Sequence, residues 1–287
     1  MRDPQMNIFS KKILLATDGS QDAELAAKTA VNLAKTTGSE LHVVTVAPGY
    51  PSFDVRVPEV VEELRRQAQN VLDEQLEKIE QAGGKVAQTH LRIAGEHPGV
   101  ERHLSDEIVE AAEEVGAGLI VMGSRGRGGI RRALMGSVSD SVVRHAHCPV
   151  MVVRQEPVLF PTKILVATDR SREAKLAATT AADLAKSTNS EVHVVHVGFE
   201  QYRDEAQNEL DTEVGMVREA GVTDVHAHLK FGIPDRTIVD SAEEESVGLI
   251  VMGSRGRGGV RRALIGSVSS SVVPHAHCPV LVVRQEE

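Results

Sequence analysis

Short apolar runs alternate along the chain with longer stretches in which apolar residues recur at helical spacing. In the first half the apolar runs are Ile13 to Thr17, Leu41 to Val46, Val86 to Ile93, Leu119 to Met122 and Val150 to Val153. Continuous apolar runs of this length are typical of strands buried on both faces of a parallel sheet. The third run is the most polar of the five, so we expect it nearer an edge of the sheet.

The segments between these runs predict amphipathic helices. Ala and Leu recur at helical spacing near Asp22 to Lys35, and a longer apolar stripe covers residues 61–79 before Gly83-Gly84 ends it. Residues 104–115 predict a third helix, and residues 137–145 a short fourth one. Strands that alternate with helices favour right-handed βαβ units, so the pattern predicts an α/β fold with a parallel sheet.

The chain contains an internal repeat. Gly118–Glu156 and Gly248–Glu286 differ only at positions 130/260, 135/265, 140/270, 144/274 and 151/281, and Lys12–Asp18 matches Lys163–Asp169. We therefore expect two tandem domains, residues 1–157 and 158–287. The middles of the two halves differ, and the first half carries an extra Pro- and Gly-rich stretch from Pro48 to Pro58 that predicts a long loop.

The near-identical segments carry glycines with a distinctive spacing. Gly123 and Gly126 follow the fourth predicted strand, and Gly136-Ser137 follow nine residues later, at the start of a predicted helix. Glycines let the backbone approach a ligand closely, and the free amides of a helix start attract anions. Ligands of parallel sheets bind beyond the carboxyl ends of the strands. The segment therefore predicts a phosphate site built from a turn and a helix start, to which the hydroxyl of Ser137 or Ser139 adds a donor.

The phosphate site is of neither common nucleotide-binding type. The chain contains no GxxxxGK[ST] loop, and no GxGxxG follows the first strand. Instead, Asp18-Gly19-Ser20 and Asp169-Arg170-Ser171 stand there. The two aspartates are able to accept hydrogen bonds from a ribose or an adenine edge, or the segment serves as a helix N-cap, and both roles can hold together.

The run GSRGRGGIRRALMGSVS, the start KILLATDGS and the end HCPVMVV resemble universal stress proteins, whose ATP motif is G-x2-G-x9-G-[ST]. The resemblance covers nearly the whole chain twice. It implies a strand order of 3-2-1-4-5 in each domain and ATP, together with Mg2+, as the ligand. In the first half it implies contacts from Ala16, Asp18, Val46, Met122, Gly123, Arg125, Gly126, Gly136, Ser137, Val138 and Ser139. In the second half it implies contacts from Ala167, Asp169, Val197, Met252, Gly253, Arg255, Gly256, Gly266, Ser267, Val268 and Ser269.

Two features of the repeats affect this expectation. Arg170 replaces Gly19 in the second half, which adds a charged side chain near the second site. The fifth strand of each half ends a sheet and needs cover. Similar single-domain proteins pair through this strand, so we expect Val150–Val153 and Val280–Val283 to pair antiparallel, giving an intrachain pseudo-dimer. A homodimer of the whole chain stays open.

The composition indicates which classes of partner and which cellular location to expect. The chain has 287 residues, 41% hydrophobic and only 2% aromatic, so the cores must be aliphatic. A net charge of -9 disfavours nucleic acid as a partner. No apolar run approaches the roughly 20 residues that cross a bilayer, and Met1–Ser10 is polar and unlike a signal peptide, so we expect a cytoplasmic protein that does not bind membranes.

Two further motifs have competing interpretations. His145-Ala-His147-Cys148 and His275-Ala-His277-Cys278 contain metal-ligand residue types, but their spacing matches no zinc signature. We interpret them as helix ends that turn into strand five, with Cys148 and Cys278 buried. Arg131-Arg132 and Arg261-Arg262 either clamp phosphates or are solvated helix residues.

Three functions remain open from the sequence. The first is an ATP-binding stress-response or regulatory protein with slow or no hydrolysis, because no residue stands out as a general base. The second is an ATP-cleaving or adenylyl-transferring enzyme, in which the loop at Pro48–Pro58 supplies a second pocket. The third is an interaction module that has lost nucleotide binding, against which the intact glycines and serines of both halves argue.

Overall fold

The computed structural model describes residues 12–49, 58–95, 103–126, 135–155, 161–256 and 265–284, which its contacts divide into two compact units at Ala146/His147. The predicted polar leader Met1–Ser10 and most of the predicted loop Pro48–Pro58 lie outside the described residues. The arginines for which two roles were open, Arg131, Arg132, Arg261 and Arg262, lie outside them as well.

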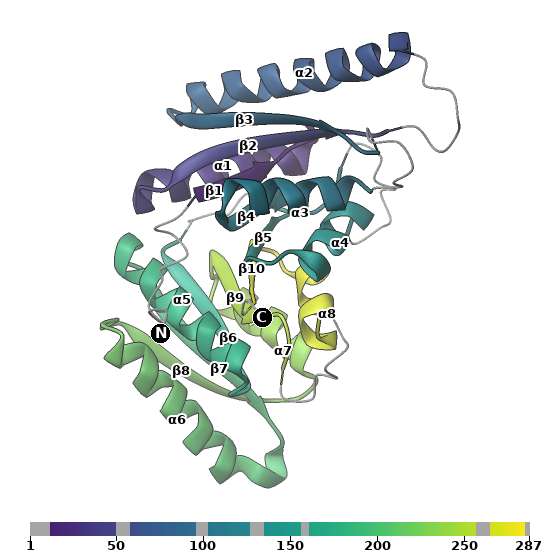
Figure 1. Ribbon diagram of the computed structural model, residues 1–287. Coiled ribbons are helices and arrows are strands. Elements are labelled where there is room, and N and C mark those ends of the chain that lie inside the picture. Colours follow the sequence, from purple (N-terminus) through teal and green to yellow (C-terminus); the bar gives the residue numbers. More distant parts are fainter. Residues whose placement is uncertain are drawn as a thin grey trace, which may run out of the picture. The chain divides into compact units, whose positions relative to one another are not determined.

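The unit of residues 12–146 is an α/β structure. Its elements are β1 (Lys12–Ala16), α1 (Gln21–Thr37), β2 (Glu40–Ala47), α2 (Pro58–Gln81), β3 (Val86–Ile93), α3 (Leu104–Val115), β4 (Ala117–Gly123) and α4 (Ser137–His145). The strands pair in parallel in the order β3-β2-β1-β4 (Figure 1). The polar strand β3 lies at the edge, as its composition predicts.

The unit of residues 147–284 contains the second repeat and the fifth strand of the first. Its elements are β5 (Val150–Val153), β6 (Lys163–Thr168), α5 (Arg172–Thr188), β7 (Glu191–Gly198), the 3-10 turn η2 (Glu200–Tyr202), α6 (Arg203–Glu219), β8 (Val225–Phe231), α7 (Pro234–Glu244), β9 (Leu249–Gly253), α8 (Ser267–His275) and β10 (Val280–Val283). The order β10-β9-β6-β7-β8 is parallel throughout, and this confirms the expected 3-2-1-4-5 order in that repeat. β5 joins it antiparallel, with Val152 beside Val280.

The strand cores are aliphatic, as the low aromatic content requires. Ile164, Leu165 and Val166 of β6 are completely buried, as are Ile13, Leu14 and Leu15 of β1. Helices α1 and α5 pack on these strands through small residues, chiefly Ala. Small side chains let a helix lie close to a sheet, and this closeness sets the geometry of the turns that follow β4 and β9.

The segments with histidine and cysteine have the structural role expected of them. α4 ends at His145 and α8 at His275, and each chain then turns into its last strand. His145 Nδ1 lies 2.8 Å from the carbonyl of Ser141, one turn back. Cys148 and Cys278 are free and buried, and burial raises the pKa of the Cys278 thiol to about 12. Among the described helices, none is both long and apolar enough to span a bilayer.

Candidate functional site

A cavity of about 680 Å³ lies at the carboxyl ends of the strands in the second unit. Its walls come from the ends of β6, β7 and β9, the start of α6 and the start of α8. All eleven residues predicted for the second half line it: Ala167, Asp169, Val197, Met252, Gly253, Arg255, Gly256, Gly266, Ser267, Val268 and Ser269. The structure therefore brings together residues from four separate stretches of the chain.

One wall of the cavity is apolar. Ala167 near the end of β6 and Met252 near the end of β9 are buried neighbours in the strand register, and Val197 comes from the adjacent strand β7. A flat apolar ring packs well against such a surface. The wall can thus hold the base of a nucleotide.

Another part of the cavity is lined by the start of α8. Its N-cap is Gly266, which offers no side-chain cap, and the amide of Gly266 donates to the carbonyl of Ser254 at 2.7 Å. The Ser269 hydroxyl donates to the carbonyl of Gly253 at 2.7 Å, so it holds the turn, whereas Ser267 is exposed in the cavity. A helix that starts without a side-chain cap presents its first amides to an anion.

The glycine turn lies directly against the acidic residue that follows strand β6. A Cβ on Gly256 would stand 2.3 Å from Oδ2 of Asp169, and one on Gly126 would stand 2.5 Å from Oδ2 of Asp18. Only glycine leaves these carboxylates in place. Each aspartate also accepts a backbone bond, since the amides of Ser20 and Ser171 donate to Oδ1 at 3.0 Å.

The N-cap interpretation of this segment is correct, but serine supplies the cap. The hydroxyl of Ser20 accepts from the amide of Ala23, and that of Ser171 accepts from the amide of Ala174. Each serine hydroxyl also donates to the glycine turn, at the carbonyl of Arg125 or Arg255. The Asp169 side chain therefore remains beside the cavity, and the Asp18 side chain has the equivalent position beside Gly126.

The arginines of the glycine turns contact neighbouring helices. Arg125 Nε donates to Asp22 of α1 at 3.2 Å, and Arg255 Nε lies 3.4 Å from Glu173 of α5. These ion pairs hold the turns against the helix starts. Contact between either guanidinium and a phosphate, expected from the sequence, stays a prediction.

The first repeat has a similar local geometry, except that its serine bonds a different carbonyl of the turn. Ala16, Val46 and Met122 lie at the carboxyl ends of β1, β2 and β4, and Gly123 ends β4. The amide of Gly136 donates to the carbonyl of Ser124 at 2.8 Å, and the Ser139 hydroxyl donates to the same oxygen at 2.7 Å. Ser137 and Val138 form the first turn of α4, whose N-cap Gly136 again has no side chain.

Sequence reasoning missed part of the cavity wall. The further lining residues include Phe199, Tyr202, Glu205, Glu209, His196 and Pro234. Phe199 and Tyr202 are 71% and 56% exposed, which is unusual for aromatic side chains in a chain that has so few. Their position directly after the apolar run 192–197 was a usable signal, because ligands bind at the carboxyl ends of strands.

Arg170 adopts a left-handed backbone conformation, φ 63°, where the first repeat has Gly19 at φ 70°. Its Nη1 donates to Oε1 of Glu209 at 2.6 Å, and Glu209 also lies 3.4 Å from Nε2 of His196. The extra charge in the second half is thus paired with a buried carboxylate that lines the cavity.

The parallel order 3-2-1-4-5 and a cavity at the carboxyl ends of the strands define an α/β protein with a pocket where such sheets commonly bind ligands. The family model for the universal stress protein family matches twice, at residues 10–154 and 161–284, so the chain belongs to the universal stress protein family.

Related proteins agree with this assignment. The chain is 32% identical over 234 residues to a universal stress protein of Mycobacterium tuberculosis, covering 72% of this chain and 78% of that one. It is 35% identical over 168 residues to a putative universal stress protein of Staphylococcus aureus, covering 58% and 97%. A solved universal stress protein from Archaeoglobus fulgidus is similar over 96% of this chain and 98% of its own, with 28% identity and a TM-score of 0.76.

Proposed function

We propose that the chain binds ATP with Mg2+ in the cavity of the second repeat and at the equivalent position of the first, and that it acts in stress response or regulation with slow or no hydrolysis. The observation that carries the proposal is the joint lining of one cavity by all eleven residues predicted for the second half. The glycine hydrogen bond recurs in the first repeat, where the Ser139 hydroxyl also holds the turn, through the carbonyl of Ser124. A cytoplasmic location and the domain limits 1–157 and 158–287 stay predictions.

The residues fit a nucleotide with a divalent cation. The apolar wall suits the base, and the start of α8 suits the phosphates. Because the Arg255 guanidinium faces Glu173, the phosphate charge must be balanced in large part by amides and a cation. Asp169, which lines the cavity, offers a carboxylate oxygen of the kind that Mg2+ prefers. When bound, Mg2+ would neutralise phosphate charge.

One observation favours the alternative of an ATP-cleaving or adenylyl-transferring enzyme. His196 and Glu209 line the cavity of the second repeat and lie 3.4 Å apart, a pairing of the kind that general bases use. The first repeat has Thr45 in place of His196. Because Glu209 is also held by Arg170, we favour a structural role for the pair.

The first experiment is to denature the purified chain and identify released nucleotides by mass spectrometry, followed by titration with Mg-ATP. We expect two adenine nucleotides per chain. Gly266→Val places a branched side chain where a Cβ is already 3.3 Å from the carbonyl of Ser254, so it should remove one of them; Gly136→Val should remove the other. We expect each to weaken its site by more than about 10-fold, or 1.4 kcal/mol.

Circular dichroism of the valine variants is the control for folding. If the variant that carries both Gly136→Val and Gly266→Val folds and binds ATP with unchanged affinity, the assignment of the two sites is refuted. Phosphate release from ATP should stay below the roughly 1 s⁻¹ at the low end of enzyme turnover. Faster release that His196→Thr abolishes would establish the enzymatic alternative.

We also propose that the β5–β10 pairing joins the two repeats as an intrachain pseudo-dimer. The register places Met151 beside Leu281, and all eight residues of the two strands are buried. Hydrogen exchange should therefore be slow for the paired amides of both strands at low protein concentration, where chain–chain association is absent. Exchange as fast as in an unfolded peptide would refute the pairing.

A further inference from the structure

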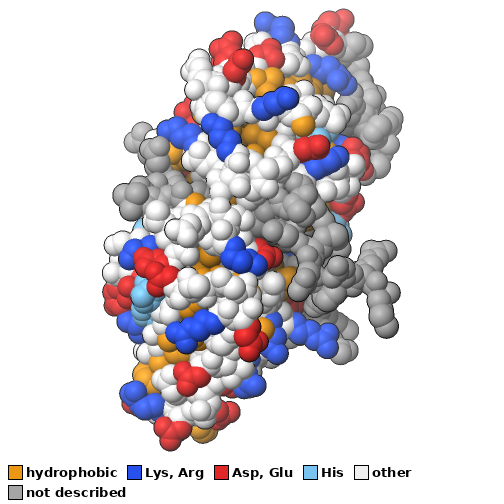
Figure 2. Space-filling model, turned by 90° about the vertical axis from the view of Figure 1, so that its left-hand side faces the viewer, with side chains coloured by type: hydrophobic (Ala, Val, Ile, Leu, Met, Phe, Trp, Pro, Cys, Tyr) orange, Lys and Arg blue, Asp and Glu red, His pale blue; other side chains and the backbone are white. Residues whose placement is uncertain are grey.

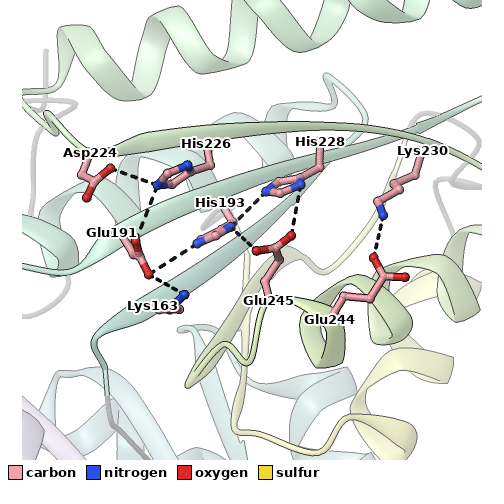
Figure 3. Close-up of polar contacts among 9 residues, drawn as sticks. All are labelled: Lys163, Glu191, His193, Asp224, His226, His228, Lys230, Glu244 and Glu245. Carbon is pink, nitrogen blue, oxygen red and sulfur yellow. Dashed lines mark hydrogen bonds and ion pairs between the residues drawn. The ribbon is translucent and has the colours of Figure 1, made fainter.

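A cluster of histidines and carboxylates lies on the second repeat, away from the nucleotide cavity. β6, β7 and β8 run parallel and begin at Lys163, Glu191 and Val225. The amino ends of the three strands therefore lie side by side, along the side of the sheet where the strands begin. His193 and His226 are partners in adjacent strands, and Glu245 follows the end of α7 (Figure 3). The cavity lies at the opposite, carboxyl ends of these strands.

The ring of His193 lies at the centre of this cluster. Its Nδ1 is 2.9 Å from Nε2 of His228 and 3.6 Å from Oε2 of Glu245, and the three ligand atoms lie within 4.8 Å of one another. Zinc–nitrogen bonds of about 2.0–2.1 Å in a tetrahedron separate neighbouring ligand atoms by about 3.3 Å. The two distances from His193 Nδ1, 2.9 Å and 3.6 Å, lie on either side of this ideal separation. Small side-chain rotations would therefore bring the three groups around one ion.

The cluster is sheltered but accessible. The side chain of His193 is 4% exposed, that of His228 16% and that of Glu245 32%. Histidine side chains reach the surface beside acidic ones in the lower half of Figure 2. Glu245 is the most exposed of the three side chains, so an ion can enter from its side.

The surroundings of both imidazoles favour the neutral form. Burial lowers the pKa of His193, and the neighbouring His228 ring lowers it further. Burial likewise lowers the pKa of His228, although Glu245 opposes the shift. Neutral imidazole is the metal-binding form, so the direction of both shifts agrees with the geometry of the cluster.

We propose that His193, His228 and Glu245 bind a divalent transition-metal ion of the Zn2+ type, which leaves a fourth position for water. Two imidazoles and one carboxylate are a ligand set that zinc uses in open sites. The other ring nitrogen of His193 lies 3.7 Å from Glu191, and Lys163 fixes that carboxylate with a 2.9 Å ion pair. A carboxylate behind a liganding histidine orients the ring.

A second grouping, made of Glu191, His193 and His226, shares the central ring. His226 is 47% exposed and already contacts Asp224 at 3.0 Å, and Glu191 is held by Lys163. These contacts compete with an ion there. We therefore place the ion between His193, His228 and Glu245, with Glu191 and His226 as flanking groups. The His226 ring stacks on the His193 ring, with 4.7 Å between the ring centroids.

The first repeat contains a natural control. His42 Nδ1 and His90 Nε2 lie 3.4 Å apart, in the same arrangement as His193 and His228. Val115 stands where the second repeat has Glu245, and Gln88 stands where it has His226. The histidine pair is therefore shared, whereas the carboxylate that completes three ligands belongs to the second repeat.

The test is a Zn2+ titration of the untagged, metal-stripped chain in competition with a chromophoric chelator. We expect one tightly bound ion per chain. Glu245→Val, which copies the first repeat, and His228→Asn should each lower Zn2+ affinity by at least about 100-fold, more than the loss of an outer partner usually costs. His42→Asn should leave the titration unchanged. X-ray absorption at the zinc edge should report two imidazole ligands.

Circular dichroism and the apo melting temperature show whether each variant folds. Failure of the wild-type chain to compete for Zn2+ would overturn the proposal. So would a tightly bound ion whose affinity is unchanged in folded Glu245→Val. These results are independent of nucleotide binding, because the cavity residues are untouched.

Discussion

Gly253→Ala should destabilise the second repeat by about 3 kcal/mol, the upper end of the cost of overpacking a close-packed interior. Gly253 ends β9 beneath the first turn of α5. An added Cβ would stand 2.7 Å from Cβ of Glu173 and 2.9 Å from its backbone carbon. Because one contact is helix backbone, no side-chain rotation can relieve it. The helix must move, and the serine cap and glycine turn move with it.

Gly215→Ala is the matched control. Gly215 lies inside α6, and a Cβ there meets nothing within 4 Å. Alanine is the better helix former by up to about 1 kcal/mol, so this variant should be more stable than the wild type. Chemical denaturation of the full chain measures both. A loss below about 1 kcal/mol for Gly253→Ala would mean that α5 shifts at little cost.

The close approach recurs in the first repeat, which gives an independent check. A Cβ on Gly123 would stand 2.7 Å from the backbone carbon of Asp22 and 2.8 Å from the amide nitrogen of Ala23. Both contacts are with the start of α1. Gly123→Ala should thus cost a similar free energy of unfolding.

The elements and their succession along the chain could be predicted because each is encoded locally, whereas the order of the strands in the sheet was implied by the family resemblance. Buried parallel strands are apolar throughout, and the covering helices repeat small residues at helical spacing, so periodicity distinguishes them. The glycines, the serines and Asp169 of the second cavity were predictable from motifs, whereas Ala167, Val197 and Met252 were implied by the family resemblance. The eleven residues come from four short stretches, three at the carboxyl ends of strands and one at the start of α8.

The remaining features depend on contacts between distant segments. Arg255 forms an ion pair with Glu173, and Arg170 forms one with Glu209. No local sequence pattern predicts either pair. The histidine cluster could not be predicted from the sequence for the same reason. His193 and His226 are separated by a whole helix, and only the register of β7 on β8 sets them side by side. A sequence search for metal ligands finds the closely spaced His145 and His147 instead.

Glu213→Gln should stabilise the second repeat by about 1–2 kcal/mol near pH 8, the usual range for a buried polar group without full compensation. Glu213 is 1% exposed on α6. Burial raises the pKa of its carboxyl, and the Thr168 hydroxyl and the Lys175 and Arg170 charges oppose the shift without cancelling it. Glu209, one turn earlier, differs because Arg170 pairs with it.

The pH dependence follows from proton binding. Above the ordinary glutamate pKa of about 4.5, the unfolded chain has released this proton while the folded chain retains it. The folded state then binds more protons, so the contribution of Glu213 to stability is full below that pKa and is lost as pH rises through the folded pKa. Replacement by Gln removes this loss, and the gain should shrink as pH falls toward about 5.

The first repeat supplies the reverse experiment. Gln75 occupies the equivalent position on α2, is 2% exposed and accepts a 2.8 Å hydrogen bond from the Thr17 hydroxyl. Gln75→Glu should therefore destabilise its repeat at high pH and have little effect near pH 5. Calorimetry of the full chain at both pH values measures each variant. A pH-independent difference between Glu213→Gln and wild type would mean that the Glu213 carboxyl is already ionised in the folded protein, and its pKa would then not be raised by burial.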